Sequence, residues 1–260
     1  MAKIIKPDPL SLSSLFLELL FGEMQLGIAT GFVWEHERIN YLITNWHVMT
    51  GFHPQTGQPI SESGATPDIL RIWLHNSERL GNWESYDLAL FDNQSRPRWK
   101  EHMTFRSTVD VAIIRLDIPD KFKLFPVNNI PFTEFRVEIS QDVFIIGFPS
   151  GITSSGKFPI WKRGSIASEP DVDIDKLPKI LIDCMTREGM SGSPVIAQYV
   201  GIYKEDSANP DPFDWIGQGR KFLGIYSGRL SGQDVFEAQL GIVWKASIIG
   251  EIINSGIRPD

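Results

Sequence analysis

The 260-residue chain contains one cysteine, no long apolar run and no excess of basic residues. Because Cys184 is alone, no disulfide can form within the chain, and the fold has to rely on its core. The longest apolar stretch near the start, residues 15–21, is short and contains Glu18, unlike a signal peptide or a membrane span. We therefore expect a cytoplasmic protein without membrane association.

The charge balance excludes further classes of function. The formal net charge is −7, whereas a nucleic-acid-binding surface usually brings a basic excess, so we expect no nucleic-acid partner. The alternating acidic segment 171–175 lacks the glycine and the terminal glutamate of a calcium loop, so neither a metal nor another cofactor is expected. With 42% hydrophobic and 22% charged residues, the composition is that of a globular protein.

Short apolar segments separated by turn residues run along most of the chain and predict an all-β barrel or sandwich. Residues 118–135 carry three prolines and no clear periodicity, which indicates a linker between a unit at 1–117 and a second at 136–260. Four isoleucines at helical spacing predict a packed C-terminal helix over 246–254. The segments expected as strands are 25–34, 41–44, 69–75, 86–91, 111–116, 143–147, 158–168, 179–185, 195–202, 222–229 and 239–244.

A serine between two glycines stands out in the segment 189–193, Gly-Met-Ser-Gly-Ser. Such a segment is either an ordinary tight turn or a bend that exposes the hydroxyl of Ser191 as a nucleophile. A nucleophilic serine needs a base, an acid that orients the base, and backbone donors for the oxyanion. Candidates for the base and the acid can be sought upstream.

His47 is the best candidate for the base, because the apolar strand 41–44 places it at the edge of a core; the alternative is a structural core histidine. Two acids begin apolar strands, Asp87 and Asp110. Asp110 has the more apolar context and immediately precedes the linker, so it can face a cleft between the halves. The other histidines, His36, His53, His75 and His102, lie in turns, loops or polar surroundings.

The order His47, Asp110, Ser191 resembles that of the trypsin/chymotrypsin-like serine peptidases, and in particular the bacterial trypsin-like peptidase domain. The similar segments cover most of the chain. They are Thr30-Gly31-Phe32, Leu42-Ile43-Thr44-Asn45-Trp46-His47-Val48, Asp110-Val111-Ala112, Gly147-Phe148-Pro149, Gly189-Met190-Ser191-Gly192-Ser193-Pro194 and Leu223-Gly224-Ile225-Tyr226-Ser227-Gly228.

This resemblance implies two six-stranded antiparallel β-barrels of the chymotrypsin type, followed by the helix. It implies a serine endopeptidase that forms an acyl-enzyme on Ser191, with His47 as general base and acid and Asp110 orienting it. The N–H groups of Gly189 and Ser191 would form the oxyanion hole. The substrate pocket would be lined by Met185, Tyr226, Ser227 and Gly228.

Two positions modify what the resemblance implies. Met190 stands where zymogen-type relatives carry an aspartate that pairs with a new N-terminus, so no activation cleavage is expected. Met185, six residues before the serine, offers no carboxylate to a basic side chain, so the default preference is for a medium apolar residue. Arg187 and Arg229 leave a preference for acidic residues open.

Other interpretations remain. Cys184 or Ser193 could be the nucleophile, although Cys184 reads as a buried strand residue and the proline after Ser193 restricts its turn. The chain could also be a silent peptide-binding module on a protease-like scaffold. The partners expected for the chain are protein or peptide substrates, and a regulatory protein partner is a further expectation.

Overall fold

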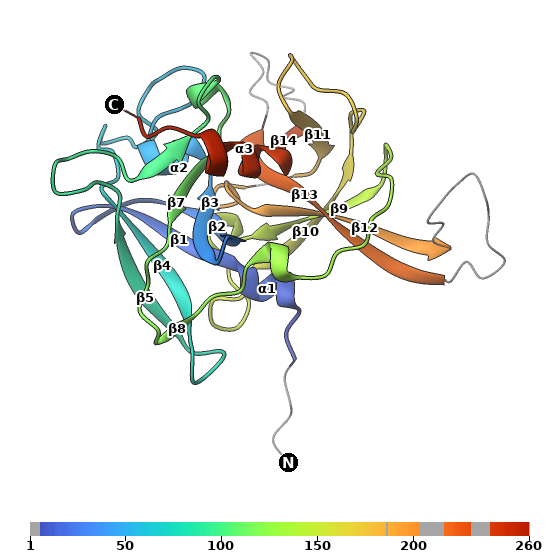
Figure 1. The fold of residues 1–260 in the computed structure, drawn as a ribbon, viewed down its shortest axis with the longest axis horizontal. Coiled ribbons are helices and arrows are strands. Elements are labelled where there is room, and N and C mark those ends of the chain that lie inside the picture. The colour runs from blue at the N-terminus through green and yellow to red at the C-terminus, as the bar shows by residue number, and fades with distance from the viewer. Residues whose placement is uncertain (1–5, 186, 203–215, 230–239, 260) are drawn as a thin grey trace.

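The computed structural model describes residues 6–185, 187–202, 216–229 and 240–259. Two β structures lie side by side, with helices near their junction (Figure 1). No helix in these ranges is long and apolar enough to cross a membrane. The first half contains α1 (Pro9–Ser13), β1 (Ser14–Phe21), β2 (Met24–His36), β3 (Ile39–Thr44), α2 (Trp46–Thr50), β4 (Ile69–Asn76), β5 (Trp83–Ala89), β6 (Trp99–Glu101), η1 (Arg106–Thr108), β7 (Ala112–Arg115) and β8 (Phe122–Lys123). The second contains η2 (Val127–Asn129), β9 (Asp142–Gly147), η3 (Pro149–Gly151), β10 (Ile160–Ile166), β11 (Lys179–Asp183), β12 (Pro194–Ile202), β13 (Ile216–Arg229), β14 (Leu240–Lys245) and α3 (Ser247–Ser255).

The second half is a closed antiparallel barrel of six strands in the order β10-β11-β14-β13-β12-β9. The first half is one sheet of eight strands in the order β5-β4-β1-β2-β3-β7-β6, with β8 paired to β4. The all-β, chymotrypsin-like fold with a C-terminal helix is therefore confirmed, and the first half differs in detail from a six-stranded barrel. Its extra strands, β6 and β8, have only three and two residues, too few to leave an alternating pattern in the sequence.

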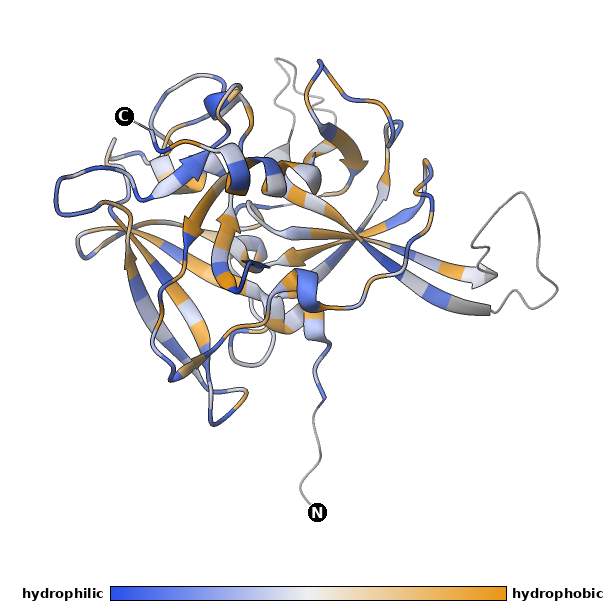
Figure 2. Cartoon of the chain, viewed as in Figure 1, coloured by the Kyte–Doolittle hydropathy of each residue, from blue (hydrophilic) through white to orange (hydrophobic). Residues whose placement is uncertain are grey.

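The strand pattern of the first sheet explains how it folds and where it places His47. Partly exposed and buried residues alternate along most of β4, so one face of this strand is buried. Figure 2 shows the apolar residues along the strands of both β structures. The hairpin β2–β3 turns at Glu37 and Arg38, whose positive φ angles of 49° and 65° are those of a two-residue type I′ loop. The hairpin leads directly into α2, which carries His47 and is anchored by the buried Val48 and Met49.

The two β structures share a core that includes the C-terminal helix. The predicted helix is confirmed as α3, and its four isoleucines are buried. They pack with Ile43, Val111 and Ile113 of the first half and with Ile225 and Trp244 of the barrel. At the other end of the chain, Leu10 of α1 packs against Ile146 and Ile196 of the barrel. Each terminal helix thus helps to fix the first sheet against the second.

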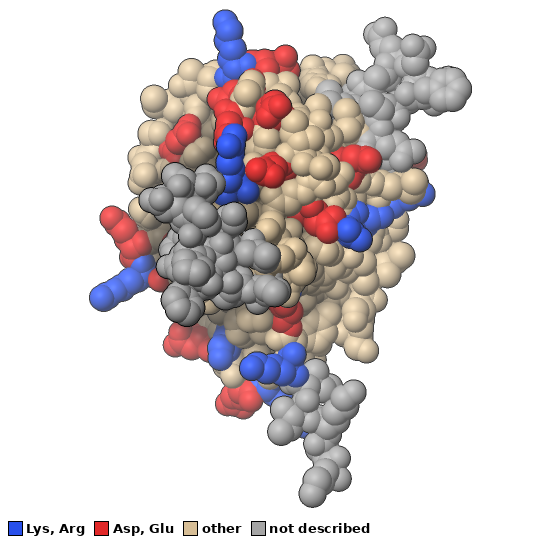
Figure 3. Space-filling view, turned by 90° about the vertical axis from the view of Figure 1, so that its right-hand side faces the viewer, with Lys and Arg blue, Asp and Glu red and all other residues tan. Residues whose placement is uncertain are grey.

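Charged residues are dispersed over the face of the barrel half (Figure 3). On the barrel face shown in Figure 3, acidic and basic side chains are interspersed rather than gathered into one patch. Several pair with each other, such as Arg163 with Asp142 and Lys245 with Asp173. Both pairs lie within the barrel half, and exposed pairs of this kind contribute little to stability.

Candidate active site

Asp110 orients His47 through two hydrogen bonds. The Nδ1 of His47 lies 2.7 Å from Oδ2 of Asp110, and the backbone N–H of His47 donates to Oδ1 at 2.9 Å. Asp110 is almost completely buried, whereas 16% of the His47 side chain is exposed. A buried carboxylate on Nδ1 keeps the ring proton on that nitrogen, so Nε2 is free to accept a proton.

Two further polar groups fix Asp110. Its backbone carbonyl accepts a hydrogen bond from Nδ2 of Asn45 at 2.7 Å, and Oγ of Ser227 donates to its Oδ2 at 2.5 Å. Ser227 belongs to β13 of the barrel, whereas Asp110 precedes β7 of the first sheet. The sequence prediction placed Ser227 in the substrate pocket and missed its contact with Asp110, because no local pattern signals a contact between residues 117 positions apart.

The serine turn depends on two glycines with positive φ, 87° at Gly189 and 84° at Gly192. A Cβ atom at Gly189 would overlap the carbonyl oxygen of Phe148, and one at Gly192 would overlap the carbonyl oxygen of Thr30. Glycine is therefore required at both positions by conformation and by space. The turn connects the end of β11 with β12 and leaves Ser191 partly exposed between the two halves.

Thr30, a fully buried residue of β2, holds this turn against the first sheet. Its N–H donates to the carbonyl of Ser191 at 2.8 Å, and its Oγ1 donates to the carbonyl of Gly189 at 2.7 Å. The same Oγ1 accepts the N–H of Phe148 at 3.3 Å. Sequence reasoning singled out the segment around Thr30 only for its resemblance and assigned the side chain no role.

Two carbonyl groups of the turn accept hydrogen bonds from neighbouring segments. The carbonyl of Glu188 accepts the N–H of Ser150 at 2.7 Å, and that of Gly189 is held by Thr30. Neither the N–H of Gly189 nor that of Ser191 donates to any group that the structure describes. Among the described residues, nothing occupies the two donors that an oxyanion hole at this turn would need.

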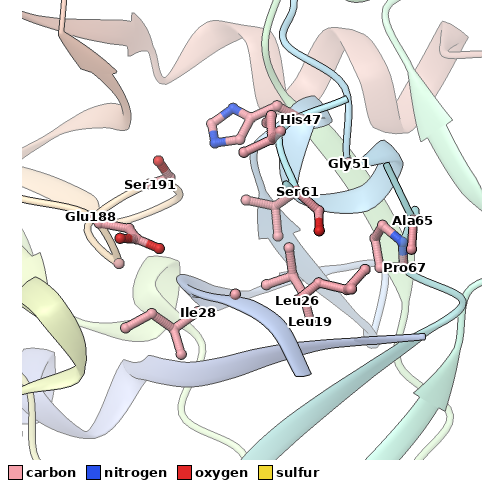
Figure 4. A pocket seen from close by; sticks show the side chains of 14 residues that line it. Leu19, Leu26, Ile28, His47, Gly51, Ser61, Ala65, Pro67, Glu188 and Ser191 are labelled. Carbon is pink, nitrogen blue, oxygen red and sulfur yellow. The ribbon is translucent and has the colours of Figure 1, made fainter. Parts of the chain in front are cut away.

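His47 and Ser191 line the same pocket and approach it from the two halves of the molecule (Figure 4). No hydrogen bond joins their side chains among the described contacts. Such bonds are often long in enzymes without substrate and shorten when the substrate binds. His47 and Ser191 therefore share one pocket, and Asp110 is hydrogen-bonded to the ring of His47.

The residues expected to line the substrate pocket lie elsewhere than in this cavity. Met185 is half exposed, and Tyr226 is buried in the barrel core. Gly228 follows Ser227 in β13 with a φ of 109°. The side chain of Arg229 and residues 186 and 230–239 lie outside the described part, so the predicted pocket is only partly described.

The other candidates for the acid and the nucleophile are Asp87, Cys184 and Ser193, and the structure shows the surroundings of each. Asp87 forms an exposed ion pair with Arg71, which lowers the pKa of this carboxyl group. Burial raises the pKa of the Cys184 thiol, which disfavours the nucleophilic thiolate. Ser193 is fully buried, and its hydroxyl has no partner among the described residues. In the described part of the chain, no three His, Cys, Asp or Glu side chains are grouped to hold a metal ion.

Comparison with known proteins concerns the family and the fold. Residues 29–201 match the model of the trypsin-like peptidase domain. The fold is similar to that of a serine endoprotease from Yersinia pestis, with 12% identity, a TM-score of 0.52, and coverage of 96% of this chain and 67% of that one. The active form of the Rv3671c protease from M. tuberculosis is 18% identical with a TM-score of 0.49, covering 96% of this chain and 84% of its own. No curated protein gives a significant match. Since the family model covers more than half of the residues, the chain belongs to the trypsin-like peptidase family.

Proposed function

We propose that the chain is a serine endopeptidase that cleaves protein or peptide substrates through an acyl-enzyme on Ser191. One observation supports this most directly. The buried carboxylate of Asp110 holds Nδ1 of His47 at 2.7 Å, and the imidazole shares a pocket with Ser191. A purely structural role for His47 would not explain why its ring lines the same pocket as a serine held on a glycine turn.

In the proposed mechanism, Nε2 of His47 removes the proton from Oγ of Ser191 while Oγ attacks the scissile carbonyl carbon. The negative charge that develops on the carbonyl oxygen is stabilised by the N–H groups of Gly189 and Ser191. Each such donor typically contributes about 3 kcal/mol to the transition state. Asp110 stabilises the imidazolium, which then protonates the leaving amine.

The second half of the reaction repeats these steps with water. His47 removes a proton from the water molecule that attacks the ester carbon, and the same two N–H groups stabilise the second oxyanion. The tetrahedral species releases the acid product, and His47 returns the proton to Ser191. The residues therefore form a closed cycle that needs no cofactor.

A fluorophosphonate probe, which reacts with activated serines, tests this proposal. We expect the wild-type protein to be labelled and to hydrolyse a peptide library, and we expect neither with Ser191→Ala. Removing Ser191 or His47 should lower kcat by about 10⁴- to 10⁶-fold. Ser193→Ala is a matched control, because it removes a buried hydroxyl two residues away and should retain both activities. If wild type neither reacts nor hydrolyses but binds peptides, the chain is a binding module.

A further inference from the structure

The cavity beside Ser191 has one polar end and mostly apolar walls, in which Ser61 is the polar side chain on the opposite side (Figure 4). Its volume is about 200 Å³. Ser191, Glu188 and His47 border one side, and the side chains of the β1–β2 hairpin and of the loop between α2 and β4 border the other (Figure 4). The apolar lining residues are Leu19, Leu26, Ile28, Val48, Ile60, Ala65 and Pro67.

If the proposed function holds, this cavity lies on the leaving-group side of the scissile bond. It contains His47, the residue that would protonate the departing amine. It contains none of Met185, Ser227 and Gly228, which are expected on the side of the acyl group. A substrate chain that crosses Ser191 from β13 would therefore enter this cavity with the residues that follow the cleaved bond.

The far wall of the cavity is built before any substrate binds. Ile60 is 52% exposed, yet its backbone is fixed, because its N–H donates to the carbonyl of Gly51 at 2.8 Å. Pro67 is buried against Gly51, and Phe52 pairs with Pro59 across the loop. A large apolar side chain held in place at a cavity mouth gains stability when another apolar group covers it.

The size of the cavity suits one side chain. An apolar cavity of about 150 Å³ accommodates a benzene molecule. A volume of about 200 Å³ therefore admits a leucine, methionine or phenylalanine side chain, and leaves most of the apolar wall uncovered when the residue is glycine or alanine.

We propose that this cavity selects substrates with a large apolar residue at the first or second position after the scissile bond, with Ile60 and Leu26 as specificity-determining residues. Glu188 is exposed at the opposite rim and offers a carboxylate. If charge rather than apolar contact governed which substrate residue enters the cavity, the carboxylate of Glu188 would favour a basic residue. The two selections predict different substrates.

The test uses peptides randomised before the scissile bond, with leucine, glycine or lysine fixed at the first or second position after it. We expect kcat/KM to be about 10- to 100-fold higher for leucine than for glycine, as expected when one such side chain is buried. Ile60→Ala should reduce this ratio about three- to tenfold. The matched control is Ile152→Ala, because Ile152 is 58% exposed and does not line the cavity.

Binding of the same peptides to Ser191→Ala, followed by fluorescence anisotropy, separates this proposal from the proposed function. If wild type hydrolyses nothing but Ser191→Ala binds leucine peptides more tightly than glycine peptides, the cavity assignment stands and the enzyme assignment fails. Equal kcat/KM values and equal affinities for leucine and glycine overturn the cavity assignment. Equal effects of Ile60→Ala and Ile152→Ala, or a preference for lysine, also overturn it.

Discussion

Replacing Thr30 by valine should separate the geometry of the serine turn from the chemistry of Ser191. Valine keeps the shape of threonine but has a methyl group where Oγ1 was. The change removes the 2.7 Å hydrogen bond to the carbonyl of Gly189 and the longer one from the N–H of Phe148. Both groups are buried, so neither can turn to water instead.

The cost to stability follows from these two bonds. A buried polar group that loses its partner costs about 1–3 kcal/mol. Because the bond to Phe148 is 3.3 Å long, most of the loss comes from the carbonyl of Gly189. We expect Thr30→Val to lower the free energy of unfolding by about 2–4 kcal/mol, which leaves a protein of ordinary stability folded. Urea unfolding monitored by tryptophan fluorescence measures it.

The cost to catalysis is a separate quantity. Once released, the peptide between Gly189 and Met190 can rotate, which loosens the turn on both sides of it; the N–H of Gly189 is then held only through the preceding peptide, whose Glu188 carbonyl accepts the N–H of Ser150. Loss of one oxyanion donor lowers kcat by about 10²- to 10³-fold. We therefore expect kcat to fall by about a hundredfold with a smaller change in KM, because the oxyanion exists only in the transition state.

Two matched variants show whether this reasoning is right. Thr30→Ser retains the hydroxyl group and should retain most of kcat. Thr44→Val removes a buried 2.8 Å hydrogen bond to the carbonyl of Thr30 without touching Gly189, so it should lower stability while kcat changes much less. If Thr30→Val is destabilised but has the same kcat as Thr44→Val, then Thr30 stabilises the fold and does not position the oxyanion hole.

Three further predictions concern other parts of the molecule. Burial lowers the pKa of His75 to about 4, whereas the unfolded chain keeps the ordinary value of about 6.5 and therefore binds more protons below that pH. Urea unfolding should show that this group lowers the free energy of unfolding by about 2 kcal/mol between pH 7 and pH 5, and this loss should be absent in His75→Phe. Gly189→Ala should abolish hydrolysis because its Cβ meets the carbonyl of Phe148, whereas Gly250→Ala, with open space in α3, should retain kcat; a strongly active Gly189→Ala would contradict the assigned conformation. Met190 is buried and cannot pair with a new N-terminus, so mass spectrometry of fluorophosphonate-labelled protein should find an intact chain, and labelling only of a shortened chain would refute this.

The parts of the site that the sequence could predict are those with local signals. An apolar strand ending in a polar residue marks His47, and a serine between glycines marks Ser191. The C-terminal helix was predicted for the same reason, since its isoleucines recur at helical spacing within nine residues. In each case the residues that determine the conformation lie within one strand, one turn or one helix.

The parts that the sequence could not predict depend on residues far apart in the chain. Thr30 contacts a carbonyl 159 positions away. His75 is followed in the sequence by the polar segment 76–79. It is nevertheless buried against Trp83, Phe125 and Phe158, which come from three separate segments. The burial of His75 is therefore a property of the assembled fold, and the sequence interpretation of polar surroundings was wrong for this residue.

The hydrogen bonds at the site cross between the halves in both directions. Thr30 of the first sheet holds the turn that carries Ser191, the proposed nucleophile, and Ser227 of the barrel holds Asp110 of the first half. Because each half holds a proposed catalytic residue of the other, neither half alone could keep His47, Asp110 and Ser191 in register. The relative position of the two β structures, set by the shared core with α3, therefore determines the geometry in which His47 meets Ser191.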